Sequence, residues 1–138
     1  MRANFLSVSL VAGGLLLVAL PVLAHHSFAA EYDSAKPVTL TGAVTKVEWM
    51  NPHARFYVDV KDQGKMTNWE FELGSPNGLM RQGWTRNSMK IGDTVVVDGY
   101  LAKDGAKLAN ARNVKLADGR KLFAGSTTDG GPTEGAKQ

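Results

Sequence analysis

Between positions 38 and 123, apolar residues recur mostly at every second position, which is the period of half-buried β-strands. Two segments alternate most clearly, the first through Phe56, Val58 and Val60 and the second through Trp69, Phe71 and Leu73. The loop between them, residues 62–65, contains a glycine that permits a tight hairpin turn. This part of the chain therefore predicts two antiparallel strands, each with one buried face.

The segment before this hairpin predicts a long, bent strand over residues 38–49. Val38, Leu40 and Val44 fall on one face of an extended chain, whereas Val47 and Trp49 fall on the other. A slip of one residue within a strand is what a β-bulge produces, and bulges bend strands.

A short helix is predicted after the third strand. Ser75 is a favourable N-cap, Pro76 suits the first helical position, and Gly83 suits the C-terminal end. Two further strands follow at residues 94–101 and 108–116, and a turn then leads into residues 120–123.

Three strands, one short helix and two strands form the order of a five-stranded Greek-key barrel of the OB type. We therefore predict an all-β fold, an OB-like barrel with one short helix between strands three and four. Another small antiparallel barrel or sandwich is the alternative.

The flanking segments have different compositions. Residues 1–24 carry Arg2, an apolar run and the small residues of a signal-peptidase site at Val22 and Ala24, so we expect a cleaved signal peptide and a mature chain from His25. A retained membrane anchor is the alternative. Residues 25–37 are expected to be a polar lead-in, residues 38–123 the barrel domain, and residues 124–138 a disordered tail with little to bury.

The net charge and the lack of cysteine exclude several kinds of partner and metal site. The formal net charge is +3, and Arg2 is the single charge that cleavage removes, so no strongly basic surface is expected. A nucleic-acid partner is therefore not predicted. The chain has no cysteine, which excludes disulfides, thiolate metal sites and a lipid-modified cysteine.

Several motifs carry a family resemblance. They are His25–Asp33, Thr45–Trp49 followed by Asn51-Pro52-His53, Gly74–Asn77, Gly99–Gly105 and Asp118–Phe123. Through them the chain resembles a family of small exported bacterial proteins that is classed as a domain of unknown function. The resemblance covers essentially residues 25–125 and implies a bacterial envelope protein with an OB-like barrel. It implies no established activity and no catalytic residues.

The three histidines, His25, His26 and His53, form a candidate metal site. After cleavage, His25 would offer its α-amine and its imidazole, and His26 or His53 would add a third nitrogen. Tetragonal nitrogen sites suit Cu(II), so copper is the candidate cofactor. Alternatively, His25 and His26 are simply solvated, and His53 forms a hydrogen bond within its own turn.

A second candidate site consists of aromatic and polar residues near the first interstrand loop. OB barrels commonly bind ligands at the loop between strands one and two and at the loop between strands four and five, here residues 50–54 and 103–107. The candidate ligand-binding residues are Trp49, Asn51, Arg55 and Tyr57. The alternative assigns most of the aromatic rings to the core, and Trp69, in phase with Phe71, fits that alternative.

An enzyme is not expected, since the chain has no cysteine nucleophile, no Gly-x-Ser-x-Gly elbow and no His-Glu-x-x-His helix. The sequence favours a periplasmic or extracellular module without catalytic activity, with no stable membrane anchor after cleavage. Its partner would be an unidentified small ligand or an envelope protein. A periplasmic copper-binding protein is the alternative function.

Overall fold

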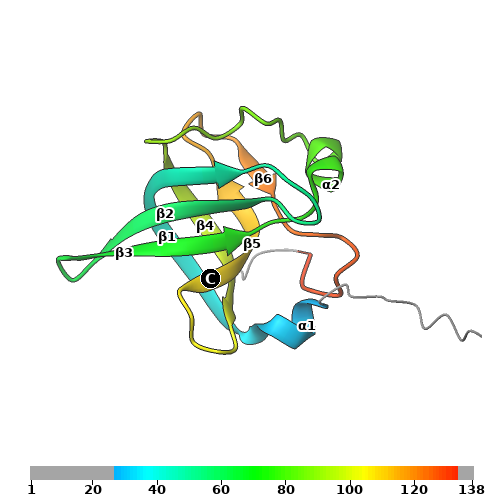
Figure 1. The fold of residues 1–138 in the computed structure, drawn as a ribbon, viewed down its shortest axis with the longest axis horizontal. Coiled ribbons are helices and arrows are strands. Elements are labelled where there is room, and N and C mark those ends of the chain that lie inside the picture. The colour runs from blue at the N-terminus through cyan, green and yellow to red at the C-terminus, as the bar shows by residue number, and fades with distance from the viewer. Residues whose placement is uncertain (1–26, 134–138) are drawn as a thin grey trace, which may run out of the picture.

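The computed structural model describes residues 27–133 of the chain. The predicted signal peptide, His25 and His26 lie outside these residues. Within them the fold is a six-stranded sheet with two short helices (Figure 1). The elements are α1 (Phe28–Glu31), β1 (Tyr32–Glu48), β2 (Arg55–Asp62), β3 (Lys65–Glu72), α2 (Pro76–Arg81), β4 (Thr94–Ala102), β5 (Leu108–Lys115) and β6 (Lys121–Phe123).

Five of the strands close into a ring. The sheet order is β3-β2-β1-β4-β5-β6 with antiparallel neighbours, and an additional parallel pairing joins β3 to β5. The long strand β1 belongs to both halves of the ring, because its first part pairs with β4 and its last part with β2. The all-β prediction with a helix between strands three and four is confirmed, and β6 adds a sixth strand beside β5.

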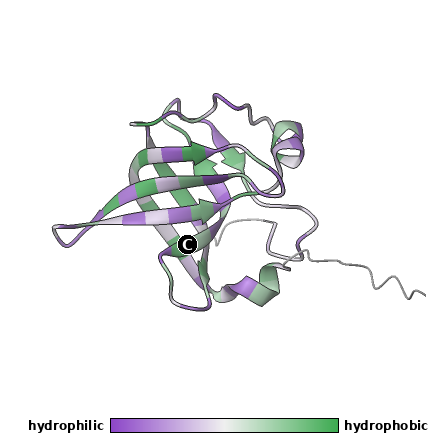
Figure 2. Cartoon of the chain, viewed as in Figure 1, coloured by the Kyte–Doolittle hydropathy of each residue, from purple (hydrophilic) through white to green (hydrophobic). Residues whose placement is uncertain are grey.

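The predicted bulge bends β1 at the expected place. Val44 pairs with Val58 and Lys46 with Tyr57, so Thr45 is the extra residue. The predicted phase of β2 is also confirmed: Phe56, Val58 and Val60 are buried and alternate with more exposed neighbours, an alternation that Figure 2 shows along the strands.

Helix α2 begins as the sequence predicts. The Ser75 side chain accepts a hydrogen bond from the Gly78 amide at 3.2 Å, and Pro76 occupies the first turn. The helix ends at Arg81 with Gln82 as its C-cap, and Gly83 follows with a φ of 93°, a left-handed conformation that glycine adopts without strain.

The polar lead-in predicted over residues 25–37 is, from Tyr32 onward, part of a strand. Strand β1 begins at Tyr32 and runs through Pro37, well ahead of the expected start at Val38. Pro37 is accommodated because this part of β1 has a neighbour on one side only, β4, and an edge tolerates the missing donor. Phe28 and Tyr32 are buried with Tyr100 and Ala102 in a second apolar cluster beside the main core.

Residues 124–133 also differ from the predicted tail. Ala124 is fully buried, and the backbone of Asp129 accepts a hydrogen bond from the Phe28 amide at 3.0 Å. The segment covers Arg112 of β5, whose side chain is wholly inaccessible to solvent. The tail therefore packs through a buried cation, which an analysis of its apolar content alone does not detect.

Candidate ligand-binding groove

An open groove lies at one end of the strand ring, where the β1–β2 loop meets α2 and the loop after it. Its volume is about 360 Å³, within the usual range of ligand sites. The lining residues are Trp49, Met50, Asn51, Pro76, Asn77, Met80, Thr85 and Arg86.

The apolar part of this groove is unusually exposed. Met50 and Met80 show 53% and 52% of their surface to solvent, although methionine is normally a core residue. Trp49 is half-buried and packs against the main core, so its position is fixed from beneath. The groove thus combines one anchored ring with two flexible thioether side chains.

Arg86 is the one charged residue among those lining the groove. It lies on a tight turn in which the Thr85 amide donates to the Ser88 hydroxyl at 2.8 Å and the Asn87 amide to the Thr85 hydroxyl at 3.3 Å. Within residues 27–133, no ion pair or hydrogen bond engages the Arg86 guanidinium. The groove therefore presents an uncompensated positive charge.

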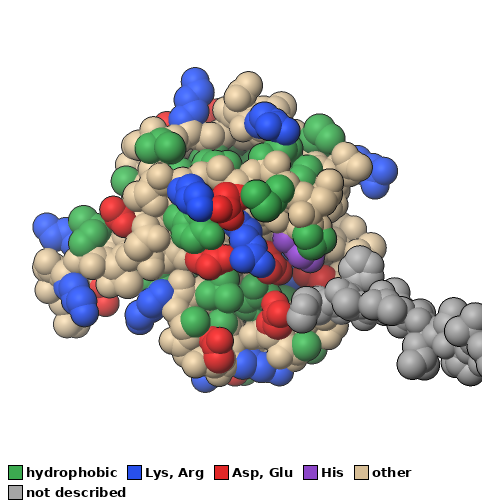
Figure 3. Space-filling view, viewed as in Figure 1, with side chains coloured by type: hydrophobic (Ala, Val, Ile, Leu, Met, Phe, Trp, Pro, Cys, Tyr) green, Lys and Arg blue, Asp and Glu red, His purple; other side chains and the backbone are tan. Residues whose placement is uncertain are grey.

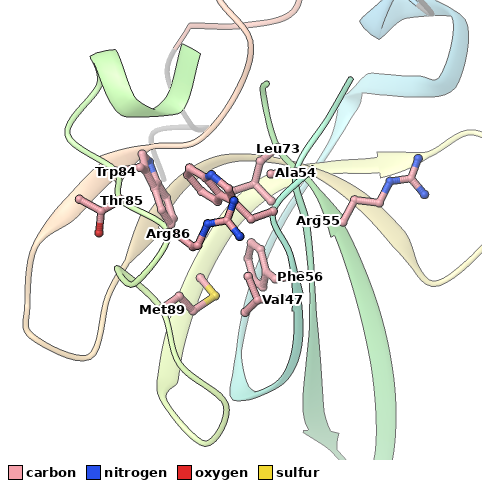
Figure 4. Close-up of a pocket in the computed structure, with 10 residues that line it drawn as sticks. Val47, Ala54, Arg55, Phe56, Leu73, Trp84, Thr85, Arg86 and Met89 are labelled. Carbon is pink, nitrogen blue, oxygen red and sulfur yellow. The ribbon is translucent and has the colours of Figure 1, made fainter. Parts of the chain in front are cut away.

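A narrow apolar slot adjoins the groove and shares Trp49, Thr85 and Arg86 with it (Figure 4). The space inside for a water-sized sphere is about 10 Å³, at the lower limit for a single water molecule. Arg86 extends toward the middle of this slot, whereas Arg55 points away from it (Figure 4). The slot belongs to the packing beneath the groove and is too small for a ligand of its own.

The structure separates the four residues that the sequence grouped as a ligand site. Trp49 and Asn51 line the groove together. Arg55 and Tyr57 lie on the outward side of β2, where Arg55 forms ion pairs with Glu70 at 2.8 Å and Glu72 at 3.5 Å. The second predicted loop, residues 103–107, does not line the groove.

The outer face of β1, β2 and β3 is a network of mutually paired charges (Figure 3). Lys46 pairs with Glu48 and lies 5.1 Å above the centre of the Tyr57 ring, and the Tyr57 hydroxyl donates to Glu48 at 3.4 Å. Burial raises the pKa of Tyr57, and the carboxylates of Glu70 and Glu48 add to that shift. Because these groups satisfy one another, this face has few free groups to offer a ligand.

His53 belongs to a second polar cluster, which it forms with Glu72 and Tyr32 and which does not line the groove. Its Nδ1 donates to the Leu73 carbonyl at 3.0 Å, so Nε2 is the ring nitrogen that this contact does not engage. The neighbouring Glu72 is almost fully buried, and burial raises the pKa of its carboxyl group against the opposing influence of His53 and Arg55. Burial, reinforced by Glu72, also raises the pKa of Tyr32.

Among residues 27–133, no three histidine, aspartate or glutamate side chains gather closely enough to hold a metal ion. The predicted ligands His25 and His26 lie outside this part of the chain, so the copper site stays a prediction. The same described region contains no helix long and apolar enough to cross a membrane.

The sequence could not single out Met80 and Arg86 as site residues. Both lie beyond the third strand, far along the chain from Trp49, and α2 and its following loop bring them to the β1–β2 loop. One signal was present: the stretch from Leu73 to Gly92 contains no acidic residue but does contain Arg81, Arg86 and Lys90.

Comparisons with known proteins identify a family but no activity. No curated protein matches the sequence. The model of a family of unknown function, DUF6152, matches residues 12–111, well over half of the chain and most of the strand ring. The resemblance to a domain of unknown function is thereby confirmed, and the chain belongs to the family of unknown function DUF6152.

Proposed function

We propose that the chain is an exported binding or accessory module of the bacterial envelope, without catalytic activity, built on an OB-type barrel. The strand order β1-β2-β3-β5-β4, with β1 shared between both halves and a parallel β3–β5 closure, supports that barrel type. The signal-like composition of residues 1–24 supports export.

The groove beside Trp49 is the observation that carries the proposal. It lies at the β1–β2 loop, which is one of the regions that OB barrels use for binding. It contains no carboxylate and no imidazole among its lining residues, so it offers no group for general acid–base catalysis near neutral pH. Its exposed methionines and free guanidinium instead suit recognition.

Photo-crosslinking in the living host tests the proposal without knowledge of the ligand. A photoreactive amino acid at Asn77, which lines the groove and is exposed, should give a covalent adduct that intact-mass analysis detects. The same amino acid at Lys61, which is exposed near the β2–β3 hairpin, is the matched control and should give background yield only. Adducts of equal yield at both positions would contradict a specific site.

Copper binding through the mature N-terminus is a second candidate, favoured by the position of His53. Its Nε2 is free to act as a ligand, while Nδ1 is held by the Leu73 carbonyl. Glu31 raises and His53 lowers the pKa of Glu72, so both groups lie within electrostatic range of that carboxyl group. His25 is three residues ahead of Phe28, the first residue of α1, so an extended chain would place it at most about 11 Å from there.

Mature protein should therefore bind one Cu(II) ion more tightly than Zn(II), with release of protons. An alanine added before His25 should weaken Cu(II) binding at least about tenfold, because the amine and imidazole no longer belong to one residue. His53→Ala should weaken it as well if the cluster closes the site. Calorimetric titration measures both effects, and unchanged affinity in the extended protein would eliminate this candidate.

A further inference from the structure

We propose that the groove receives a peptide segment of a partner protein that carries a carboxylate beside an apolar side chain. This inference rests on the proposed binding function and names the chemistry of its ligand.

The charge of the groove selects the carboxylate. Arg86 has no ionic partner within residues 27–133, and none of the groove-lining residues is acidic. A guanidinium offers several N–H donors in a fixed plane that matches the two oxygens of a carboxylate. The stretch from Leu73 to Gly92 contributes three cations and no acid, so its own charge attracts an acidic segment and repels a basic one.

The apolar side chain is selected by Trp49, Met50 and Met80. Both methionines are about half-exposed, and a partner side chain placed between them would be shielded from water. Thioether side chains adapt their shape to what they contact, and tryptophan and arginine are the residues most often found at the energetic centres of interfaces. These three side chains adjoin Arg86 in one groove, so the ligand must carry the apolar group and the acid close together.

Two asparagines suit an extended main chain. Asn51 and Asn77 are exposed, line the groove, and make no side-chain hydrogen bond within the described residues. An amide side chain both donates and accepts, as peptide groups of a bound segment require. The concave shape favours an inserted segment over a lipid surface, which is flat on this scale.

Selection from a random heptapeptide library on the immobilised mature chain tests the inference. We expect enriched peptides to carry Asp or Glu next to Leu, Met or Phe. Arg86→Glu should weaken the binding of these peptides at least tenfold and should shift a repeated selection toward Lys and Arg. Lys61→Glu is the matched control, since Lys61 is an exposed cation of β2 that does not line the groove and lies outside the stretch from Leu73 to Gly92, and it should change binding less than twofold.

A second pair of variants tests the apolar contact. Met80→Ala should weaken binding of the selected peptides several-fold, whereas Met66→Ala, at an equally exposed methionine outside the groove, should leave it unchanged. Melting curves of all variants should coincide with that of the parent chain, because each altered side chain is exposed.

Three outcomes would overturn the inference. The first is enriched peptides without acids, and the second is equal affinity for the parent chain and Arg86→Glu. The third is Arg86-dependent binding to phosphatidylglycerol vesicles without any peptide selected. If crosslinks form from Asn77 in the host but the library selects no acidic peptide, this inference fails and the proposed function stands. If both experiments are negative, both fail.

Discussion

Replacing Arg112 by alanine should destabilise the domain by about 3–5 kcal/mol, the usual cost of removing one member of a buried ion pair. The Arg112 side chain is inaccessible to solvent. Its guanidinium donates to the Ser126 carbonyl at 3.2 Å and to the Asp129 carboxylate at 3.0 Å, and it lies 4.6 Å from the centre of the Phe28 ring. Urea unfolding followed by tryptophan fluorescence measures the loss.

The expected loss of stability is large because the Arg112 guanidinium connects β5 with the tail and with α1. Without it, residues 126–129 lose their partner, and the Phe28 ring loses the group that it packs against. Truncation after Gly125 should therefore reproduce a large part of the loss, because it removes the same contacts from the other side.

Arg120→Ala is the control for this substitution. Arg120 also forms an ion pair, with Asp118, but both side chains of that pair are exposed. Its removal should therefore change stability by less than about 1 kcal/mol. An effect of Arg112→Ala no larger than that of Arg120→Ala would show that the tail does not pack.

Val58→Asp should cost more than about 4 kcal/mol and leave little folded protein at room temperature. Val58 is completely buried in the centre of β2, where it pairs with Val44 of β1 and with Trp69 of β3. An aspartate there would place an unpaired charge in the core of the ring. Circular dichroism and thermal melting would report the loss.

Tyr57→Asn is the matched variant for Val58→Asp. Tyr57 is the neighbouring residue of β2 but points to the outer face, where its hydroxyl donates to Glu48. Because successive strand residues face opposite sides, this variant should cost much less than Val58→Asp. Equal damage from both substitutions would mean that the strand faces are assigned in the wrong phase.

The sequence predicts those parts of the fold that local pattern determines. Alternation identifies β2 and β3, a one-residue slip identifies the bulge at Thr45, and the capping residues Ser75 and Pro76 identify α2. Each of these signals lies within a few neighbouring positions. For the same reason Trp49 and Asn51, which lie at a strand end and in the following loop, were recognisable as candidate site residues.

Features that depend on distant partners could not be predicted in this way. The composition of residues 124–133 predicts a solvated tail. The tail packs because Arg112 of β5 is buried and pairs with Asp129 of this segment. Arg55 is a residue type that often binds ligands, but its guanidinium forms ion pairs with Glu70 and Glu72 on the neighbouring strand. The residues that α2 and its loop contribute to the groove join it only because this segment returns to the β1–β2 loop.

The measurement that tests the account most directly is the adduct yield from photoreactive side chains placed around the ring in the living host. The positions are Asn77 in the groove, Asn68 on the outer face of β3, Lys61 near the hairpin and Lys115 on β5, all of them exposed. We predict a specific adduct from Asn77 alone, lost when Arg86→Glu is combined with it. A specific adduct from Asn68 with none from Asn77 would contradict the account, since it would place binding on the face of paired charges.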